Sequence, residues 1–252
     1  MWRVRSGAVT HSLDEMSNLR AEVERHSWYH TLELGDGVVT DGMFDHRPVL
    51  DRYPLPADLG GKRCLDVATM DGFWAFEMER RGAASVTAID LDDPEDLDWP
   101  AALRPDHDRT LDETKAERFA LAKRALGSQV ERVTLSAYDL GPELGEFEFV
   151  FCGDLLLHLK DPITPVERIR SVCVGSAVIV NVIKRFRFRE RVPLATLDGI
   201  DEFEWWTTNL AGLVRIVRAA GFDRVEPAEP FELPFRTGGQ WRGLRGAVRA
   251  FV

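Results

Sequence analysis

The chain has few cysteines and no long apolar run. Its 252 residues include three Cys, at positions 64, 152 and 173, which are widely spaced and lack any CxxC or Cys/His pairing. This spacing argues against a disulfide framework or a zinc site and is typical of reduced core residues in a cytoplasmic protein. The longest apolar run, 172–183, contains polar residues and is shorter than the roughly 20 residues that span a bilayer. The N-terminus lacks the apolar stretch of a signal peptide.

Positive charge is scarce, and lysine is the scarcest basic residue. Asp and Glu number 42 against 32 Lys and Arg, for a net charge of −10, and only five of the basic residues are Lys. The excess of Arg is typical of GC-rich genomes such as those of actinobacteria. The acidic balance argues against a surface that mainly neutralises nucleic-acid phosphates. With 44% hydrophobic residues, the chain should fold and bury a full core.

Strand and helix patterns alternate from Arg63 onward, which predicts an α/β fold with a doubly wound, mostly parallel seven-stranded sheet. The expected strands are 63–67, 85–89, 130–136, 147–152, 174–182, 222–226 and 244–251. The expected helices are 13–26, 73–81, 113–126, 162–172 and 209–220. Residues 1–60, which contain Gly-rich and Pro-rich connections, are expected to form an N-terminal helical and loop cover over a domain of residues 61–252.

Carboxylates follow the first two expected strands of this sheet. In such sheets, ligands bind beyond the carboxyl ends of the strands. A pyrophosphate-binding G-x-G-x-x-G loop is absent, and Asp71 would repel a pyrophosphate, so a hydride-transferring nicotinamide enzyme is disfavoured. An adenosine ligand without phosphates fits better, with Asp90 for the ribose, Asp66 for an ammonium group and Gly72 leaving room. The alternative is that Asp66 and Asp71 only cap the next helix.

The segment LDVATMDGFWAFEMERRGAASVTAID resembles motifs I and II of the class I S-adenosylmethionine-dependent methyltransferases. With WYHTLELGDGVVTDG, GDLLLHLKDP and WWTTNLAGLVRIVRAAGF, it more narrowly resembles the branch that contains the bacterial tRNA wobble-uridine carboxymethyltransferases. The resemblance implies a Rossmann-like methyltransferase sheet and S-adenosyl-L-methionine as cofactor, although Met70 replaces the usual second glycine of motif I. The cofactor-binding residues that it implies are Asp66, Ala68, Gly72, Phe73, Asp90, Leu91, Tyr138, Asp139, Cys152 and Gly153.

Two departures from this branch bear on the methyl donor. The tRNA enzymes use carboxy-S-adenosylmethionine and need cationic and phenolic groups to hold its extra carboxylate. Here Leu157 replaces the tyrosine before the histidine, and the segment 40–46 has no lysine. Because an unpaired buried carboxylate is costly, we expect ordinary S-adenosylmethionine.

The acidic composition and the expected donor favour a small-molecule acceptor over tRNA. The chain is similar to actinobacterial sugar O-methyltransferases, which implies O-methylation of a saccharide or oligosaccharide acceptor. The narrowest version is the 1-hydroxyl of a mannoside in mycobacterial methylmannose polysaccharide synthesis. Two alternatives stay open, a tRNA-modifying enzyme and a non-catalytic protein that binds S-adenosylmethionine.

His158 lies just past the fourth expected strand, where a base could remove the proton of an acceptor hydroxyl. Asp154 precedes it by four residues and is expected either to orient His158 or to hold a metal such as Mg²⁺. The alternative is that His158 only caps a loop. The acceptor residues expected from their positions are Trp28, Tyr29, His30, Trp206 and Asn209, of which His30 and Trp206 also suit structural roles.

Two charged segments have more than one interpretation. Residues 184–191 alternate basic and aromatic side chains, which suits RNA or phosphate, but equally a strand with an Arg-rich face or an oligomer contact. A homodimer is therefore left open. In the acidic stretch after the second strand, His107 lies between two aspartates, which suits either a solvated loop or a magnesium site shared with Asp92 or Asp93.

Overall fold

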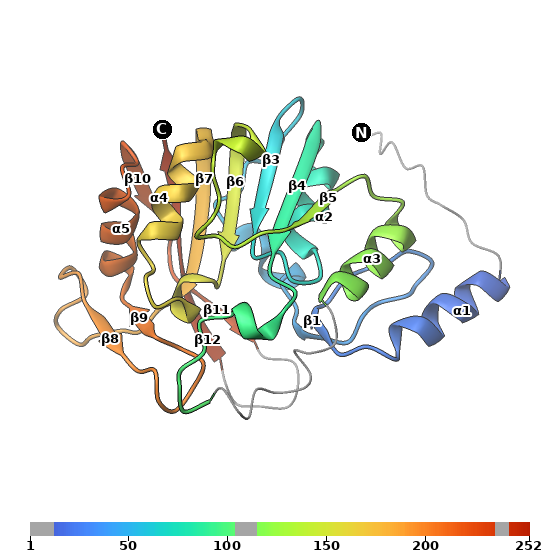
Figure 1. Cartoon of the computed structure of the whole chain (residues 1–252), viewed down its shortest axis with the longest axis horizontal. Coiled ribbons are helices and arrows are strands. Elements are labelled where there is room, and N and C mark those ends of the chain that lie inside the picture. The colour runs from blue at the N-terminus through green and yellow to red at the C-terminus, as the bar shows by residue number, and fades with distance from the viewer. Residues whose placement is uncertain (1–12, 104–114, 235–241) are drawn as a thin grey trace.

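A central eight-stranded sheet with helices on both faces forms the body of the molecule (Figure 1). The structure is a computed structural model that describes residues 13–103, 115–234 and 242–252. The strands of the sheet are β3 (Arg63–Val67), β4 (Ser85–Asp90), β5 (Glu131–Thr134), β6 (Phe147–Gly153), β7 (Cys173–Val182), β10 (Arg224–Pro227), β11 (Phe231–Pro234) and β12 (Arg242–Phe251). Their order is β10-β12-β7-β6-β3-β4-β5, and β11 pairs with β12. The seven predicted strands are all present, and β11 adds a short eighth.

The parallel part of the sheet is buried on both faces. Residues Cys64 to Val67 of β3 and Phe149 to Cys152 of β6 are all buried, as expected for parallel strands that helices cover on either side. Strand β4, which follows β3 in the chain, pairs with one edge of β3. Strand β6 pairs with the other edge of β3. The order therefore reverses between β3 and β6, and their loops diverge at the carboxyl edge. Strand β12 is antiparallel to β7, β10 and β11, and is the late antiparallel addition that the sequence predicts.

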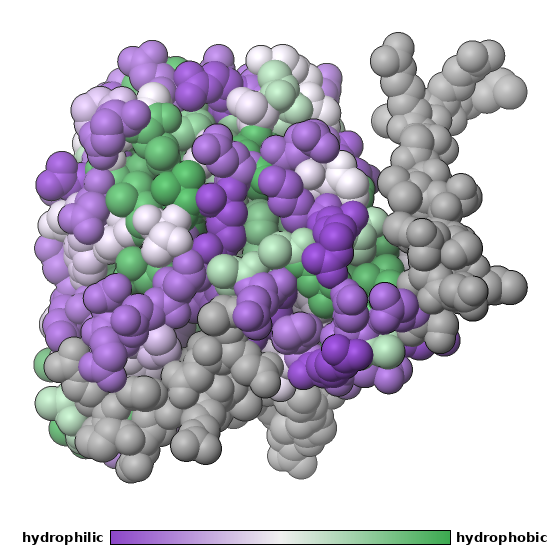
Figure 2. Space-filling view, turned by 45° about the vertical axis from the view of Figure 1, so that its right-hand side comes forward, coloured by the Kyte–Doolittle hydropathy of each residue, from purple (hydrophilic) through white to green (hydrophobic). Residues whose placement is uncertain are grey.

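The described residues form five α-helices. They are α1 (Leu13–Val23), α2 (Phe73–Arg80), α3 (Lys115–Leu126), α4 (Thr164–Val172) and α5 (Leu210–Ala219). Helices α2 and α3 share one buried cluster with one face of β3 and β6, and α4 and α5 share a second cluster with the opposite face. Alternate strand residues divide between the two clusters, since side chains along a strand point to opposite faces. The outer surface is mixed, with hydrophilic residues over much of the face in Figure 2.

The N-terminal segment is part of the first buried cluster. Strands β1 (Trp28–His30) and β2 (Gly42–Phe44) pair in parallel, and a 3₁₀ helix spans Arg47–Arg52. Trp28 and Tyr53 are buried in the same cluster as helix α2. A Cβ atom on Gly42 would lie 2.1 Å from the carbonyl carbon of His30, so only glycine permits this close strand approach. The segment thereby reaches the carboxyl edge of the sheet.

Several regions differ from the sequence-based expectation or lie outside the described residues. Residues 184–191 form an irregular, mostly exposed loop with turns and no strand, so the interpretation as a strand is wrong. A separate antiparallel pair, β8 (Ala195–Leu197) and β9 (Trp206–Thr208), precedes α5. Residues 104–114, which include His107, are outside the described part. Within the described ranges, every helix is too short or too polar to cross a bilayer.

Candidate functional site

A cavity of about 340 Å³ lies at the carboxyl ends of β3, β4 and β6. Loops after these strands and the N-terminal segment contribute its walls, and its size is typical of small-molecule sites. Nine of the residues expected from the sequence line it: Tyr29, His30, Ala68, Asp90, Leu91, Tyr138, Gly153, Asp154 and His158. The structure thus gathers much of the expected cofactor set, both expected catalytic residues and two acceptor residues around one space.

The loop after β3 turns through left-handed backbone conformations. Ala68 has a φ of 63°, Met70 of 53° and Gly72 of 97°. Glycine adopts positive φ values without strain, whereas at Ala68 and Met70 hydrogen bonds hold the backbone in this conformation. The backbone N–H of Ala68 donates to the Ile89 carbonyl and that of Met70 to Asp90 Oδ2 at 2.7 Å. The replacement of a glycine by Met70 therefore keeps a left-handed backbone, and the Met70 side chain lines the cavity.

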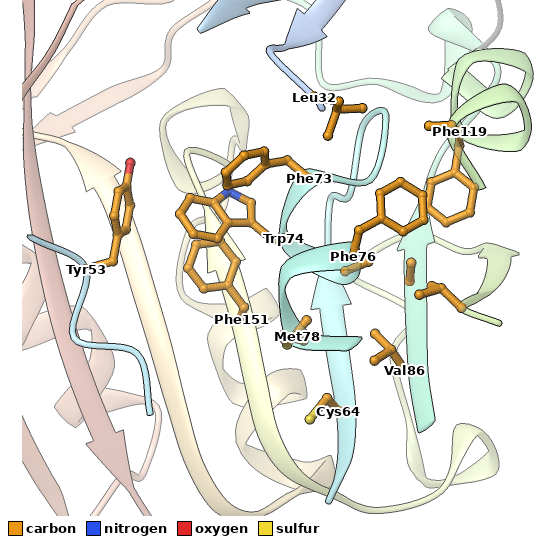
Figure 3. Close-up of a cluster of buried hydrophobic side chains, with 14 of the residues drawn as sticks. Leu32, Tyr53, Cys64, Phe73, Trp74, Phe76, Met78, Val86, Phe119 and Phe151 are labelled. Atoms are coloured by element: carbon orange, nitrogen blue, oxygen red, sulfur yellow. The ribbon is translucent and has the colours of Figure 1, made fainter. Parts of the chain in front are cut away.

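Gly72 and Phe73 do not line the cavity, so their expected cofactor contacts stay predictions. A Cβ atom on Gly72 would lie 2.5 Å from Cε2 of Phe76 and 2.8 Å from Cε2 of Phe119. The missing side chain at Gly72 thus makes room for packing between α2 and α3, and not for a cofactor; Phe76 faces Phe119 in Figure 3. Phe73 packs against the ring of His46 with a centroid distance of 5.2 Å.

Asp90, at the end of β4, is buried and bound by several donors. Its Oδ2 accepts from Met70, and its Oδ1 accepts from the Leu91 backbone N–H at 2.8 Å and from Lys115 Nζ at 2.7 Å. Lys115 is buried at the start of α3 and lines the cavity. Sequence reasoning missed Lys115, since 25 residues separate it from its partner.

Asp66 lies behind the loop and outside the cavity. It is 1% exposed, and its Oδ2 accepts a hydrogen bond from the Thr69 hydroxyl at 2.7 Å. Burial raises the pKa of Asp66 to about 7. A direct contact between Asp66 and a ligand ammonium group is therefore not what this arrangement provides.

The loop after β5 lines the cavity with Ser136, Ala137 and Tyr138, whereas Asp139 is exposed and does not line it. The Tyr138 hydroxyl donates to Asp98 Oδ2 at 2.7 Å. The expected adenine contact of Asp139 therefore stays a prediction, and Ser136, which the sequence did not indicate, lines the cavity. Cys152 does not line the cavity either, because its side chain is buried in the cluster shared with α4 and α5.

His158 is held in one tautomer. Its Nδ1 hydrogen-bonds the backbone carbonyl of Phe203, whose ring lies 4.8 Å from the imidazole. A carbonyl can only accept, so Nδ1 carries the proton and Nε2 keeps its lone pair. Burial lowers the pKa of His158 below its usual value. The residue is therefore a neutral imidazole at pH 7, as a general base requires.

Asp154 pairs with Arg245 and does not orient His158. Its Oδ2 accepts from Arg245 Nε at 2.7 Å, across 91 residues of chain, and Arg245 is only 3% exposed. The expected role as the orienter of His158 is wrong, because the Phe203 carbonyl fills it. In the described ranges no group of three or more His, Cys, Asp or Glu side chains could hold a metal ion.

Aromatic side chains form the wall opposite the cofactor-side loops. We call Tyr29, His46, Tyr53, Trp74 and Phe151 the aromatic wall; all five line the cavity. The ring centroids of Trp74 and Phe151 are 4.2 Å apart, and those of Tyr53 and Trp74 are 4.5 Å apart. Figure 3 shows the stacked Trp74 and Phe151 rings. His46 Nδ1 bonds the Tyr53 hydroxyl at 2.7 Å. Burial lowers the pKa of His46 and raises that of Tyr53, so both are neutral.

Three expected acceptor residues have structural positions instead. Trp28 is buried in the core and donates to the Val23 carbonyl at 2.9 Å. Trp206 donates to the Lys160 carbonyl at 2.9 Å, and Asn209 caps helix α5 by accepting from Gly212 at 2.8 Å. None of the three lines the cavity.

Solved methyltransferase structures match the chain along most of its length. The N-terminal domain of EvdMO1, crystallised in the presence of SAH and D-fucose, has a TM-score of 0.61 at 15% identity and covers 98% of this chain and 100% of that chain. The chain has the class I methyltransferase fold. An S-adenosylmethionine-dependent methyltransferase from Mesorhizobium loti gives a TM-score of 0.53 at 16% identity, covering 82% of this chain and 97% of that chain. The predicted fold class is confirmed.

Sequence comparison adds a curated relative. The tRNA U34 carboxymethyltransferase of Ectopseudomonas mendocina (strain ymp) is 27% identical over 172 residues, which are 67% of this chain and 47% of that protein. The chain therefore matches about half the length of this curated relative. No family model matches the chain.

Proposed function

We propose that this chain is an S-adenosylmethionine-dependent methyltransferase that methylates a hydroxyl group of a saccharide or similar small acceptor. The observation that carries the proposal is the shared cavity, which joins Asp90, Tyr138 and Gly153 on one side to the neutral His158 and the aromatic wall on the other. The methyltransferase fold and the resemblance of the loop after β3 to motif I support the same cofactor. Donor and acceptor would then share one space, as methyl transfer requires.

The cofactor-side residues fit an adenosine without phosphates. Asp90 is positioned for the ribose, and Ser136, Ala137 and Tyr138 offer a mixed polar and apolar wall for the base. Gly153 keeps the end of β6 free of a side chain next to the Trp74 indole nitrogen, which lies 3.6 Å from where its Cβ would be. S-Adenosylmethionine supplies a methyl group that passes from sulfur to the acceptor oxygen, so that a C–S bond breaks as a C–O bond forms.

His158 takes the proton of the acceptor hydroxyl in this proposal. Nε2 is the free nitrogen of the ring, since Nδ1 is bound to the Phe203 carbonyl. The backbone carbonyl fixes the tautomer and stabilises the positive charge that the ring gains with the proton. Since burial keeps the ring neutral before reaction, the base does not have to lose a proton first.

The aromatic wall supports a ring-shaped acceptor with several hydroxyls. Trp74, Tyr53 and Phe151 offer flat apolar faces. Trp74 and Tyr29 both line the cavity, and an indole N–H and a phenol hydroxyl can donate hydrogen bonds to acceptor oxygens. One structural neighbour was crystallised in the presence of a sugar, D-fucose. The most specific form of this proposal has the 1-hydroxyl of a mannoside as the methylated group.

Two measurements test the proposal. Calorimetry with S-adenosylmethionine and S-adenosylhomocysteine should show binding of both, whereas binding of neither would overturn the methyltransferase assignment and favour a scaffold protein. Turnover of methyl-labelled donor is then measured with D-fucose, methyl α-D-mannoside and mannobiose, with and without Mg²⁺. Cofactor binding without methylation of any saccharide would reject the acceptor class and leave the donor assignment intact.

Arg245 favours a second candidate, transfer from carboxy-S-adenosylmethionine. The sequence shows no cationic group near the site, but the fold brings buried Arg245 close enough to Tyr29 to influence its hydroxyl. Arg245 Nη1 has no partner within the described ranges, and the curated relative is a carboxymethyltransferase. Against this candidate, the Asp154 carboxylate already pairs with Arg245 and would repel a further carboxylate. Tighter binding of carboxy-S-adenosylmethionine than of S-adenosylmethionine, with tRNA turnover, would reverse our preference.

A further inference from the structure

We propose that Lys115 recognises the cofactor ribose together with Asp90, an inference that rests on the proposed function. Lys115 lies on α3, and Asp90 ends β4, yet their side chains meet at 2.7 Å on the wall of the cavity. Both are more than nine-tenths buried. Neither the motifs in the sequence nor the resemblance to known methyltransferases indicates a role for Lys115.

The hydrogen bonds that Asp90 already accepts leave it few free acceptor positions for the two hydroxyls of a ribose. A carboxylate oxygen accepts up to two hydrogen bonds. Oδ1 already receives the Leu91 N–H and the Lys115 ammonium, and Oδ2 receives the Met70 N–H. One acceptor position on Oδ2 remains, so Asp90 alone can hold only one of the two ribose hydroxyls as a donor.

Lys115 can supply a hydrogen-bond donor for the second ribose hydroxyl. An ammonium group has three N–H donors, and the described structure uses one of them, on Asp90. The side chain also lines the cavity, so the other two donors can reach a ligand there. One ribose hydroxyl would therefore donate to Asp90 Oδ2 while its neighbour accepts from Lys115 Nζ. The pair presents one acceptor and one charged donor, which match a vicinal diol.

A purely structural role would not account for this arrangement as well. Buried ion pairs often stabilise a fold no better than apolar residues of similar size, because both charges lose their hydration. Lys115 lines the cavity, and a ligand oxygen bound there would give its buried ammonium group a second partner. The structural alternative remains a clear outcome of the experiment below.

The experiment is calorimetry of the full chain with S-adenosylhomocysteine and with its 2′-deoxy and 3′-deoxy analogues. On the wild type, each deletion should weaken binding about tenfold, because one removes a donor to Asp90 and the other an acceptor for Lys115. In Lys115→Met, one deoxy analogue should bind within about twofold of S-adenosylhomocysteine. That analogue lacks the hydroxyl that Lys115 would bind, and the variant no longer has the lysine to reward that hydroxyl. Lys123→Met, on the same helix but away from the cavity, is the matched control and should keep both penalties.

Other outcomes would overturn the inference. If Lys115→Met keeps both tenfold penalties, Lys115 only fixes α3 to β4. If Lys115→Met does not fold, Lys115→Gln, which keeps a donor for Asp90, takes its place with the same expected loss of one penalty. Equal binding of all three ligands by the wild type would also reject the inference without any variant. Failure of the wild type to bind S-adenosylhomocysteine would instead reject the proposed function itself.

Discussion

Asp71 in the loop after β3 binds both the backbone and the ring of His30 in β1. Its Oδ2 accepts from the backbone N–H groups of Tyr29 at 2.8 Å and His30 at 3.0 Å, and its Oδ1 contacts His30 Nδ1. Burial by itself would raise the pKa of Asp71, but the His30 contacts hold it below its usual value. One buried carboxylate therefore ties the strand that carries Tyr29 to the loop that carries Ala68 and Met70. This role differs from a helix cap.

Replacement of Asp71 should loosen this connection. Asp71→Ala leaves two backbone N–H groups of β1 without their acceptor, and each unsatisfied buried group costs about 1–3 kcal/mol. We expect a loss of about 3 kcal/mol in the free energy of unfolding, measured with urea. Asp71→Asn, which keeps one side-chain oxygen, should lose less. A loss below about 1 kcal/mol for Asp71→Ala would contradict the connection.

His158→Ala should separate catalysis from cofactor binding. Because His158 is proposed to act only on the acceptor proton, turnover should fall by about 10²-fold or more while the affinity for S-adenosylhomocysteine stays nearly unchanged. Asp90→Ala should show the opposite pattern, with weaker cofactor binding. Labelled-donor turnover and calorimetry measure the two effects. Near-normal turnover in His158→Ala would return the residue to a structural role.

The pH dependence of turnover follows from the environment of His158. Burial lowers the pKa of His158 below its usual value of 6.5, so the ring loses its proton more readily than a free imidazole. The basic form then persists to lower pH, and kcat/KM should be flat from about pH 7 to 8.5 and fall only on the acidic side of 6.5. A pH profile at saturating donor checks this. A midpoint above pH 7 would exclude His158 as the base.

Two substitutions in the loop after β3 should have contrasting effects. Gly72→Ala places a Cβ atom 2.5 Å from Phe76 at a φ of 97°, so it should cost about 2 kcal/mol or more. Met70→Gly relieves a left-handed residue but makes the unfolded chain more flexible, so its stability should stay within about 1 kcal/mol of the wild type. Urea unfolding of both variants compares them directly. Equal losses would mean that Gly72 has no special packing role.

Asp66 should make stability depend on pH. Its pKa is about 7 in the folded chain against 3.8 in the reference state, because of burial, so the folded state holds the proton more tightly. Stability must then fall as pH rises between these values, and Asp66→Asn should remove that loss. We expect the advantage of Asp66→Asn to be larger at pH 8 than at pH 5 by at least about 1 kcal/mol. Asp51→Asn, at an exposed position, should show no such difference.

The cofactor side of the site was more predictable than the acceptor side. Ala68, Asp90, Leu91, Tyr138 and Gly153 each lie at or directly after the carboxyl end of a strand, so a strand pattern suffices to bring them to one edge. The strand pattern does not, however, tell which of two adjacent residues at a strand end lines the cavity. Cys152 and Gly153 are adjacent, but side chains alternate along a strand, so burial of Cys152 in the opposite cluster follows from its exact register.

The acceptor side depends on contacts between distant parts of the chain. Arg245 reaches Asp154 from β12, and His46 and Tyr53 join Trp74 from an irregular segment with little periodicity. No regular spacing of residues in the sequence predicts such long-range pairs. Trp206 and Asn209 lie after the expected strands and look equally suitable, yet a backbone carbonyl and a helix end use their polar groups.

The sequence by itself determined the doubly wound sheet, the positions of its strand ends and hence the place of the cavity. These follow from hydrophobic periodicity and from the geometry of parallel strands, which are local properties of the chain. Only the tertiary structure decided that Arg245 pairs with Asp154, that the Phe203 carbonyl orients His158, and that Lys115 joins Asp90. Buried polar groups must find partners wherever packing brings them, and packing is set by the whole fold.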